Sequence, residues 1–169
     1  MSALPAPKNR VVFDVNVFMN AAAGGSLPKT WPLLPPRTSN PYADCVGIVN
    51  DAREWSLFVS PRLMRTLYYM LVDPTGFGWD PTPAETYCAI IRDIAQASGG
   101  AEIKPNQIVV DCPDNEDNSV LELALAAQAN ILVTSDHKHL IPMSPWRGIA
   151  IITPDAFRKR VEVARRNRR

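Results

Sequence analysis

Short, continuous apolar runs that end at polar residues constrain the fold of this chain more than any other feature. The first run, Val11-Val12-Phe13, ends at Asp14. Similar runs occupy residues 57–59, 131–133 and 149–152, with 108–110 as a plausible fifth. Because the runs are continuous rather than alternating, they predict strands that are buried on both faces, as in a covered parallel sheet.

Segments of helical length separate the predicted strands, with apolar residues at intervals of three and four. They cover residues 42–54, 61–72, 84–98 and 119–129. Ser60-Pro61 and the capping-box pattern Ser119-Val-Leu-Glu122 mark two helix starts. This alternation predicts an α/β fold, a three-layer α/β/α sandwich around a parallel sheet of about five strands.

The length and composition predict a single domain over residues 1–169, because 46% hydrophobic residues suffice for one core. We place the core at about residues 10–157. The segment 155–169 should form a C-terminal helix with a Thr or Asp cap, ending in a frayed basic tail. Two Pro- and Gly-rich segments, 24–41 and 73–83, should be loops.

Cysteine usage and hydropathy bear on the compartment. Three widely spaced cysteines fit neither a disulfide framework nor a paired zinc motif. No segment has the apolar length of a signal peptide core or a membrane span. We therefore expect a soluble, cytoplasmic protein without membrane contact. Residues 158–169 hold seven basic residues and one acidic residue, a tail that would either attract a polyanion or serve only to keep the protein soluble.

Acidic residues follow the predicted strands at the edge where an open parallel sheet binds ligands. Asp14 ends the first run, Asp136 follows the run at 131–133, and Asp117 lies near the start of a helix, together with Asp114 and Glu116. Carboxylates that meet repel one another unless a cation is present, and an all-oxygen set favours Mg²⁺ or Mn²⁺. The sequence therefore predicts a metal site suited to phosphodiester hydrolysis.

Two sequence blocks resemble the PIN-domain nucleases, and most closely the VapC-like toxins. VVFDVNVFMNAA at 11–22 is similar to the family's opening DxN motif. EDNSVLELALAAQANILVTSDHKHL at 116–140 resembles its later block, in which an Asp-Asn pair opens a helix and a strand leads to Thr-Ser/Gly-Asp. The resemblance implies an endoribonuclease that hydrolyses RNA with Mg²⁺ or Mn²⁺, a homodimer, and inhibition by a cognate antitoxin protein.

The resemblance also implies residue roles. Asp14, Asp117 and Asp136 would be the catalytic, metal-binding carboxylates. Asn16, Asn118 and Ser135 would support them: Asn16 would hold the first Asp and its water, and Ser135 would hydrogen-bond the last Asp.

One family residue is missing. PIN nucleases usually have a Glu in a segment similar to residues 60–67, where this chain has Arg62, Arg65 and Thr66. Either Asp114 or Glu116 fills in, or the three Asp residues suffice, or the domain is a catalytically impaired module that binds RNA or protein.

Other residues allow several interpretations. His137 and His139 are interpreted as surface or substrate-rim residues rather than zinc ligands. Arg62, Arg65 and Lys138 are candidates for RNA binding, although a solvated helix face is the simpler account of the two arginines. A phosphatase or receiver-like domain also has Asp residues at strand ends, but the Asp-Asn helix opening fits it poorly.

Overall fold

The computed structural model describes residues 9–23 and 40–168, within which five strands form one parallel sheet. The strands are β1 (Asn9–Phe13), β2 (Trp55–Val59), β3 (Ala101–Glu102), β4 (Ile131–Val133) and β5 (Ala150–Ile152). Their order is β3-β2-β1-β4-β5, and every pairing is parallel. The chain reverses its direction of winding at β1 and β4, so the carboxyl ends of these two strands flank the switch point where α/β sheets bind ligands.

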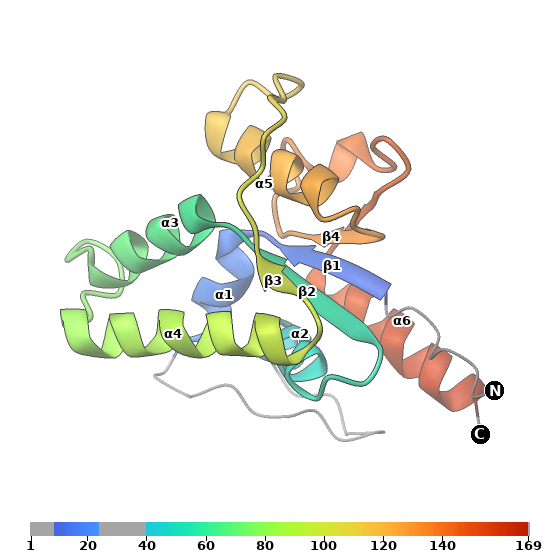
Figure 1. Ribbon diagram of the computed structural model, residues 1–169, viewed down its shortest axis with the longest axis horizontal. Coiled ribbons are helices and arrows are strands. Elements are labelled where there is room, and N and C mark those ends of the chain that lie inside the picture. The colour runs from blue at the N-terminus through green and yellow to red at the C-terminus, as the bar shows by residue number, and fades with distance from the viewer. Residues whose placement is uncertain (1–8, 24–39, 169) are drawn as a thin grey trace.

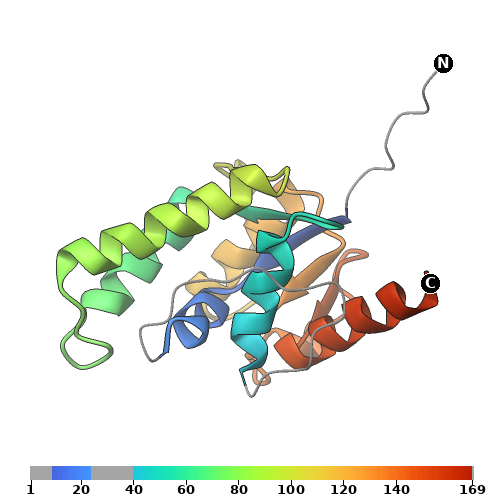
Figure 2. The ribbon, with the colours of Figure 1, turned by 90° about the horizontal axis from the view of Figure 1, so that it is seen from below.

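Helices cover both faces of this sheet, as predicted (Figure 1). They are α1 (Val15–Ala21), α2 (Pro41–Asn50), α3 (Pro61–Val72), α4 (Pro81–Ala97), α5 (Asn115–Ala126), the 3₁₀ helix η2 (Ile141–Met143) and α6 (Pro154–Asn167). The helix α5 lies above the sheet in Figure 1, and α1, α2 and α4 lie below it. Figure 2 shows α2 between α4 and α6, and α2 contacts both.

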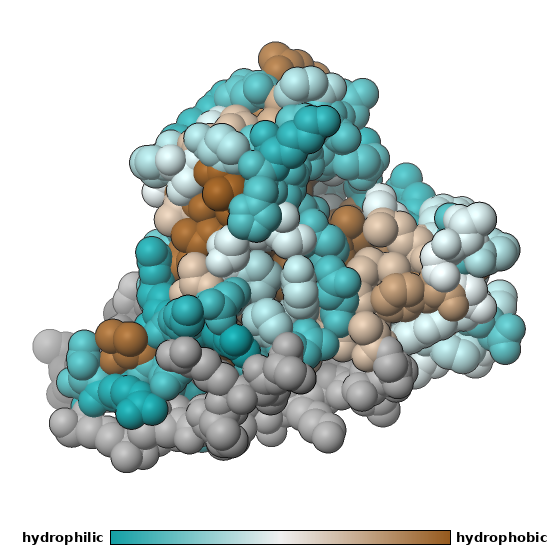
Figure 3. All heavy atoms as spheres, turned by 180° about the vertical axis from the view of Figure 1, so that it is seen from behind, coloured by the Kyte–Doolittle hydropathy of each residue, from teal (hydrophilic) through white to brown (hydrophobic). Residues whose placement is uncertain are grey.

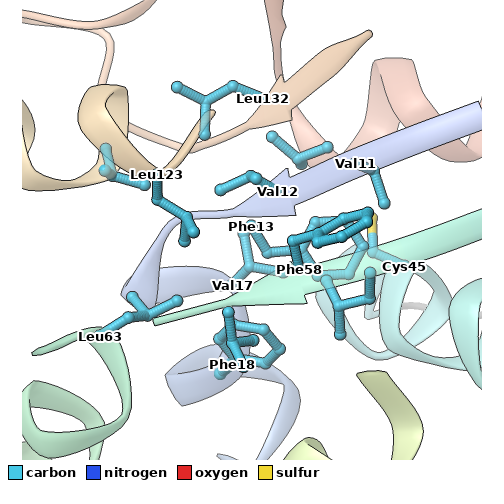
Figure 4. Close-up of a cluster of buried hydrophobic side chains, with 14 of the residues drawn as sticks. Val11, Val12, Phe13, Val17, Phe18, Cys45, Phe58, Leu63, Leu123 and Leu132 are labelled. Atoms are coloured by element: carbon cyan, nitrogen blue, oxygen red, sulfur yellow. The ribbon is translucent and has the colours of Figure 1, made fainter. Parts of the chain in front are cut away.

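The side chains of the central strand β1 lie in the middle of the hydrophobic core. Val11, Val12 and Phe13 are fully buried, as the continuous apolar run predicted. Figure 4 shows side chains from the helices and the neighbouring strands around them, including Phe18 and Leu123. Aromatic rings pack against each other in this core: the tilted rings of Phe13 and Phe18 have centroids 5.7 Å apart. Burial on both faces anchors the strand that ends at Asp14.

The predicted strand at 108–110 is wrong, and the fifth strand is β3 at Ala101–Glu102. Ile108 is 86% exposed and Val110 is 78% exposed, so only Val109 contributes to the core. β3 pairs with the end of β2 because Gly100 allows a close approach: a Cβ on Gly100 would lie 1.7 Å from the carbonyl oxygen of Leu57. The apolar pattern did not reveal a two-residue strand that depends on this contact.

Helix starts were predicted with mixed success. Ser60 caps α3 through Leu63 N–H, and Thr153 caps α6, both as predicted. The predicted start at Ser119 is wrong, because α5 begins four residues earlier and Asp114 is its N-cap. Asp114, Glu116 and Asp117 thus belong to the cap and first turn of α5, whose free amides favour negative charge. The short helix α1 was not predicted.

The C-terminal segment forms a helix, as predicted, and this helix extends to Asn167, so most of the basic residues expected in a frayed tail lie within α6. Arg165 is 4% exposed and forms ion pairs of 2.8 Å with Asp51 and Glu54. Arg158 pairs with the buried Asp44, also at 2.8 Å. Part of the basic charge therefore fixes α6 against α2 and the following turn. Arg169 lies outside the described residues.

The surface shows no continuous apolar band in the view of Figure 3, where hydrophobic residues form separate groups among polar ones. No helix in residues 9–23 and 40–168 has the length and hydropathy needed to cross a membrane. Of the two predicted loops, 24–41 lies almost wholly outside the described residues. The other, 73–83, is shorter than predicted, since α4 begins at Pro81.

Candidate active site

Asp14 occupies the carboxyl end of β1 and is also the N-cap of α1. Its backbone N–H continues the sheet ladder by donating to Val133, so Asp14 lies beside the end of β4. Its Oδ1 accepts from Val15 N–H at 2.7 Å, and its Oδ2 accepts from the Asn16 amide at 3.3 Å. The side chain is therefore fixed in one orientation at the switch point of the sheet.

Thr134 connects the first and last predicted aspartates. Its hydroxyl donates to Asp14 Oδ2 at 2.7 Å and accepts from Asp136 N–H at 3.0 Å. We expected Ser135 to provide this kind of support, and the fully buried Thr134 does so. The sequence signals for this residue were its position directly after the apolar run of β4 and its place as the Thr of the Thr-Ser-Asp motif.

Asp114 sets the geometry of the first turn of α5. Its Oδ1 accepts from the backbone N–H groups of Glu116 and Asp117, at 2.7 and 3.3 Å. Asn118 uses both ends of its amide on the backbone of Cys112, at 2.8 Å each. Asp114 and Asn118 therefore fix the loop before α5, and this positions Asp117.

Asp117 and Asp136 come together around His139. The His139 Nδ1 lies 3.1 Å from Asp117 Oδ2 and 3.8 Å from Asp136 Oδ2. One potential ligand atom of each of the three residues lies within 4.8 Å of the others. The other oxygen of Asp136 accepts from the N–H groups of Lys138 and His139, both at 3.0 Å. His139 is thus part of the cluster, whereas His137 is exposed.

Glu116 faces α3, at the place where the family Glu was expected. Its Oε1 is 2.8 Å from Arg62 Nη2, and the Thr66 hydroxyl lies 3.5 Å from its Oε2. A cavity of about 120 Å³ lies between α1, α3 and α5, and its lining includes Asp14, Thr66 and Glu116. Of the two acids proposed as substitutes for the missing Glu, Glu116 shares this cavity with Asp14.

A comparison with models of protein families identifies the family of this chain. The model of the PIN domain family matches residues 10–138, about three quarters of the chain. The chain belongs to the PIN-domain family. None of the curated proteins compared with the chain matches it. The family is one of nucleases, and its membership confirms the predicted α/β fold and disfavours the receiver-like alternative.

Repulsion between carboxylates shows in the acid–base properties of this PIN domain. Burial, as the largest cause, and the neighbouring charges of Asp136, Asp114 and Asp14 together raise the pKa of Asp117 to about 6. The pKa of Asp14 is also raised, mainly by burial and in part by Asp136 and Glu116, while the bonds from Thr134 and Val15 lower it. Without a cation, Asp14 and Asp117 therefore hold their protons more tightly than isolated aspartates do.

The donor set of the PIN domain fits a divalent cation. Asp117 and Asp136 offer carboxylate oxygens, which suit Mg²⁺ and Mn²⁺, within one group of potential ligands. Asp14 lies near enough for its charge to raise the pKa of Asp117. Asn16 adds an independent observation: its Oδ1 is buried and has no hydrogen-bond partner among the described residues. A buried acceptor without a donor is costly unless a cation or water satisfies it.

The candidates for RNA binding differ in their surroundings. Arg62 is paired with Glu116 at the edge of the site. Arg65 is exposed and lines a different cavity of about 460 Å³ between α3 and α4, with Tyr68 and Tyr69. Lys138 is exposed and follows Asp136 in the loop after β4. Arg62 and Lys138 therefore flank the carboxylates from opposite segments, and Arg65 points to a neighbouring surface.

Proposed function

We propose that this PIN domain is a metal-dependent endoribonuclease. The observation that carries the proposal is the convergence of Asp14, Asp117 and Asp136, which come from β1, α5 and the loop after β4. Burial and neighbouring negative charges raise the pKa values of Asp14 and Asp117, and carboxylates that repel one another in this way are a costly arrangement if the site contributes only to folding. Cation binding and phosphodiester hydrolysis make use of that arrangement.

Each residue has a defined part in the proposed reaction. Asp14, Asp117 and Asp136 would hold the cation, with Asn16 Oδ1 close to Asp14 as a further oxygen donor. The chemistry supplied by bound Mg²⁺ or Mn²⁺ is the activation of water and the neutralisation of charge on the phosphodiester. Thr134 holds Asp14 and the backbone of Asp136 in register.

Charge around the site supports a polyanionic substrate. Lys138 is exposed beside Asp136, and Arg62 lies at the edge of the cavity that contains Asp14. Cations at these positions would hold the backbone phosphates that flank the scissile bond, without selecting a base. Asn118 and Ser135 complete the proposed site as supporting residues.

We further propose that the domain is the toxin of a toxin–antitoxin pair and acts in the cytoplasm as a homodimer. The support is the resemblance of residues 11–22 and 116–140 to VapC-like toxins. Because uncontrolled cleavage of RNA would harm the cell, such a protein would need a cognate antitoxin that inhibits it. Expression of the protein alone should then arrest growth, and co-expression of the protein encoded beside it should restore growth.

A second function is favoured by one observation, the presence of Thr66 where the family has Glu. A PIN domain with a weakened centre would bind RNA, or a protein partner, without cutting it. Glu116 opposes this alternative, because it brings a carboxylate to the same cavity from α5.

One assay separates the two functions. The protein and its Asp14→Asn variant are incubated with end-labelled RNA in Mg²⁺, in Mn²⁺ and in EDTA. The nuclease proposal requires internal cleavage by the parent protein in metal, and none by the variant or in EDTA. Binding of RNA with intact product under every condition would support the second function instead. Circular dichroism of both proteins checks that the substitution leaves the fold unchanged.

A further inference from the structure

His139 lies beside two carboxylates of the site. Its Nδ1 is 3.1 Å from Asp117 Oδ2 and 3.8 Å from Asp136 Oδ2. The side chain is 28% exposed, whereas the Asp117 and Asp136 side chains are 13% and 20% exposed. The imidazole therefore faces the carboxylates and remains accessible to solvent on one side.

We propose that His139 is a metal ligand that joins Asp117 and Asp136, so that the site prefers a transition metal such as Mn²⁺ to Mg²⁺. The inference rests on the proposed function for the presence of a cation, and adds its selectivity. Imidazole nitrogen is a good ligand for first-row transition metals, whereas Mg²⁺ is bound almost entirely through oxygen. One nitrogen in the donor set would therefore shift the preference of the centre.

The distances are compatible with a shared ion. Two ligand atoms bound at about 2.1 Å to one cation stand roughly 3 Å apart when they occupy adjacent positions, and roughly 4 Å apart when they are opposite. The separations from Nδ1 to the two carboxylates lie in this range. A neutral imidazole can present a lone pair at Nδ1 while Nε2 carries the proton.

Local structure holds His139 in this position. Its backbone N–H donates to Asp136 Oδ1 at 3.0 Å, as does that of Lys138. The turn thus forms around one oxygen of Asp136 and leaves the other oxygen facing His139. Leu140, the next residue, is fully buried and anchors the end of the turn in the core. The imidazole is therefore positioned before any ion binds.

Calorimetric titration of the metal-free protein with Mn²⁺ and with Mg²⁺ tests this selectivity. In His139→Gln, we expect the Mn²⁺ affinity to fall by about tenfold or more and the Mg²⁺ affinity by less than about threefold. The matched control is His137→Gln, at an exposed position two residues away, which should change neither affinity. Equal losses for both ions would mean that His139 only orients Asp117, and would overturn the proposal, as would no loss for Mn²⁺.

A spectroscopic measurement on the parent protein tests the proposal without relying on the folding of His139→Gln. Electron spin echo spectra of the Mn²⁺-loaded parent protein should contain ¹⁴N modulation from a directly bound imidazole, and His137→Gln should retain it. If Mn²⁺ binds but the parent shows no such modulation, His139 is not a ligand, and the proposed nuclease function is untouched. If neither ion binds and RNA stays intact, the proposed function itself fails. The parent spectrum decides the matter even if His139→Gln does not fold.

Discussion

Arg62 on α3 and Glu116 on α5 form an ion pair across the mouth of the site, with Nη2 and Oε1 2.8 Å apart. Both side chains are about half exposed, so the pair adds little to stability. Its importance is positional. It holds a carboxylate from α5 next to Thr66, on the helix where the resemblance to PIN nucleases implies a Glu.

The position of Glu116 leads to a prediction of functional replacement. Glu116→Ala should lower kcat/KM for RNA cleavage by about tenfold or more, equivalent to about 1.4 kcal/mol of transition-state stabilisation. Thr66→Glu in that background should restore most of the loss, since it supplies a carboxylate to the same cavity from α3. Asp93→Ala, at an exposed position on α4, is the control. Full activity of Glu116→Ala would show that three aspartates suffice.

The raised pKa of Asp117 predicts how stability depends on pH when metal is absent. The folded protein holds this proton up to about pH 6, whereas an unfolded Asp releases it near 3.8. The folded state thus binds more protons between these values, and stability is lost as the pH rises through this window. Removal of the charge by Asp117→Asn should therefore stabilise the metal-free protein at pH 7.5, by roughly 1–3 kcal/mol.

Urea unfolding in EDTA at pH 5.0 and pH 7.5 measures this effect. The parent should be more stable at the lower pH, and Asp117→Asn should show a smaller difference between the two. Mn²⁺ should raise the stability of the parent at pH 7.5, because it offsets the repulsion. An unchanged midpoint for Asp117→Asn at pH 7.5 would show that the carboxylates do not strain the fold.

Loss of the Thr134 hydroxyl should shift the pH profile of the reaction. Its hydrogen bond lowers the pKa of Asp14, so Thr134→Val should raise that pKa and move the acid limb of kcat/KM to higher pH. The substitution should also cost about 1–3 kcal/mol of stability, because it leaves buried polar groups unsatisfied. Thr134→Ser retains the hydroxyl and should keep the parent profile. A Val variant with the same acid limb as the parent would contradict the prediction.

Substitution of Arg165, which lies far from the site, should have a large effect on stability. Its side chain is 1% exposed and contacts two carboxylates, so Arg165→Ala should destabilise the protein by about 3–5 kcal/mol. Arg166→Ala removes a cation of the same helix that is 61% exposed, and should cost less than about 1 kcal/mol. Thermal unfolding compares the two. Similar losses would mean that the ion pairs do not anchor α6.

The sequence was sufficient for regular, locally encoded structure. Continuous apolar runs identified β1, β2, β4 and β5 because strands buried on both faces have no polar alternation. It failed where structure depends on distant contacts. The two residues of β3 pair with β2 only because Gly100 fits against Leu57, and the run at 108–110 stays outside the sheet. The start of α5 was misplaced because two overlapping capping patterns, at Asp114 and Ser119, compete in the sequence.

The sequence by itself determined the chemistry available at the sheet edge, because Asp14, Asp117 and Asp136 stand at recognisable strand and helix ends and carry the PIN-domain motifs. Only the tertiary structure decided which other side chains reach them. Thr134, His139 and Glu116 are separated from their partners by up to 120 residues or by a helix, and their roles follow from the packing of α3, α5 and the loop after β4. Spacing along a chain fixes which face a residue occupies, whereas distances between side chains of different elements are set by how those elements pack.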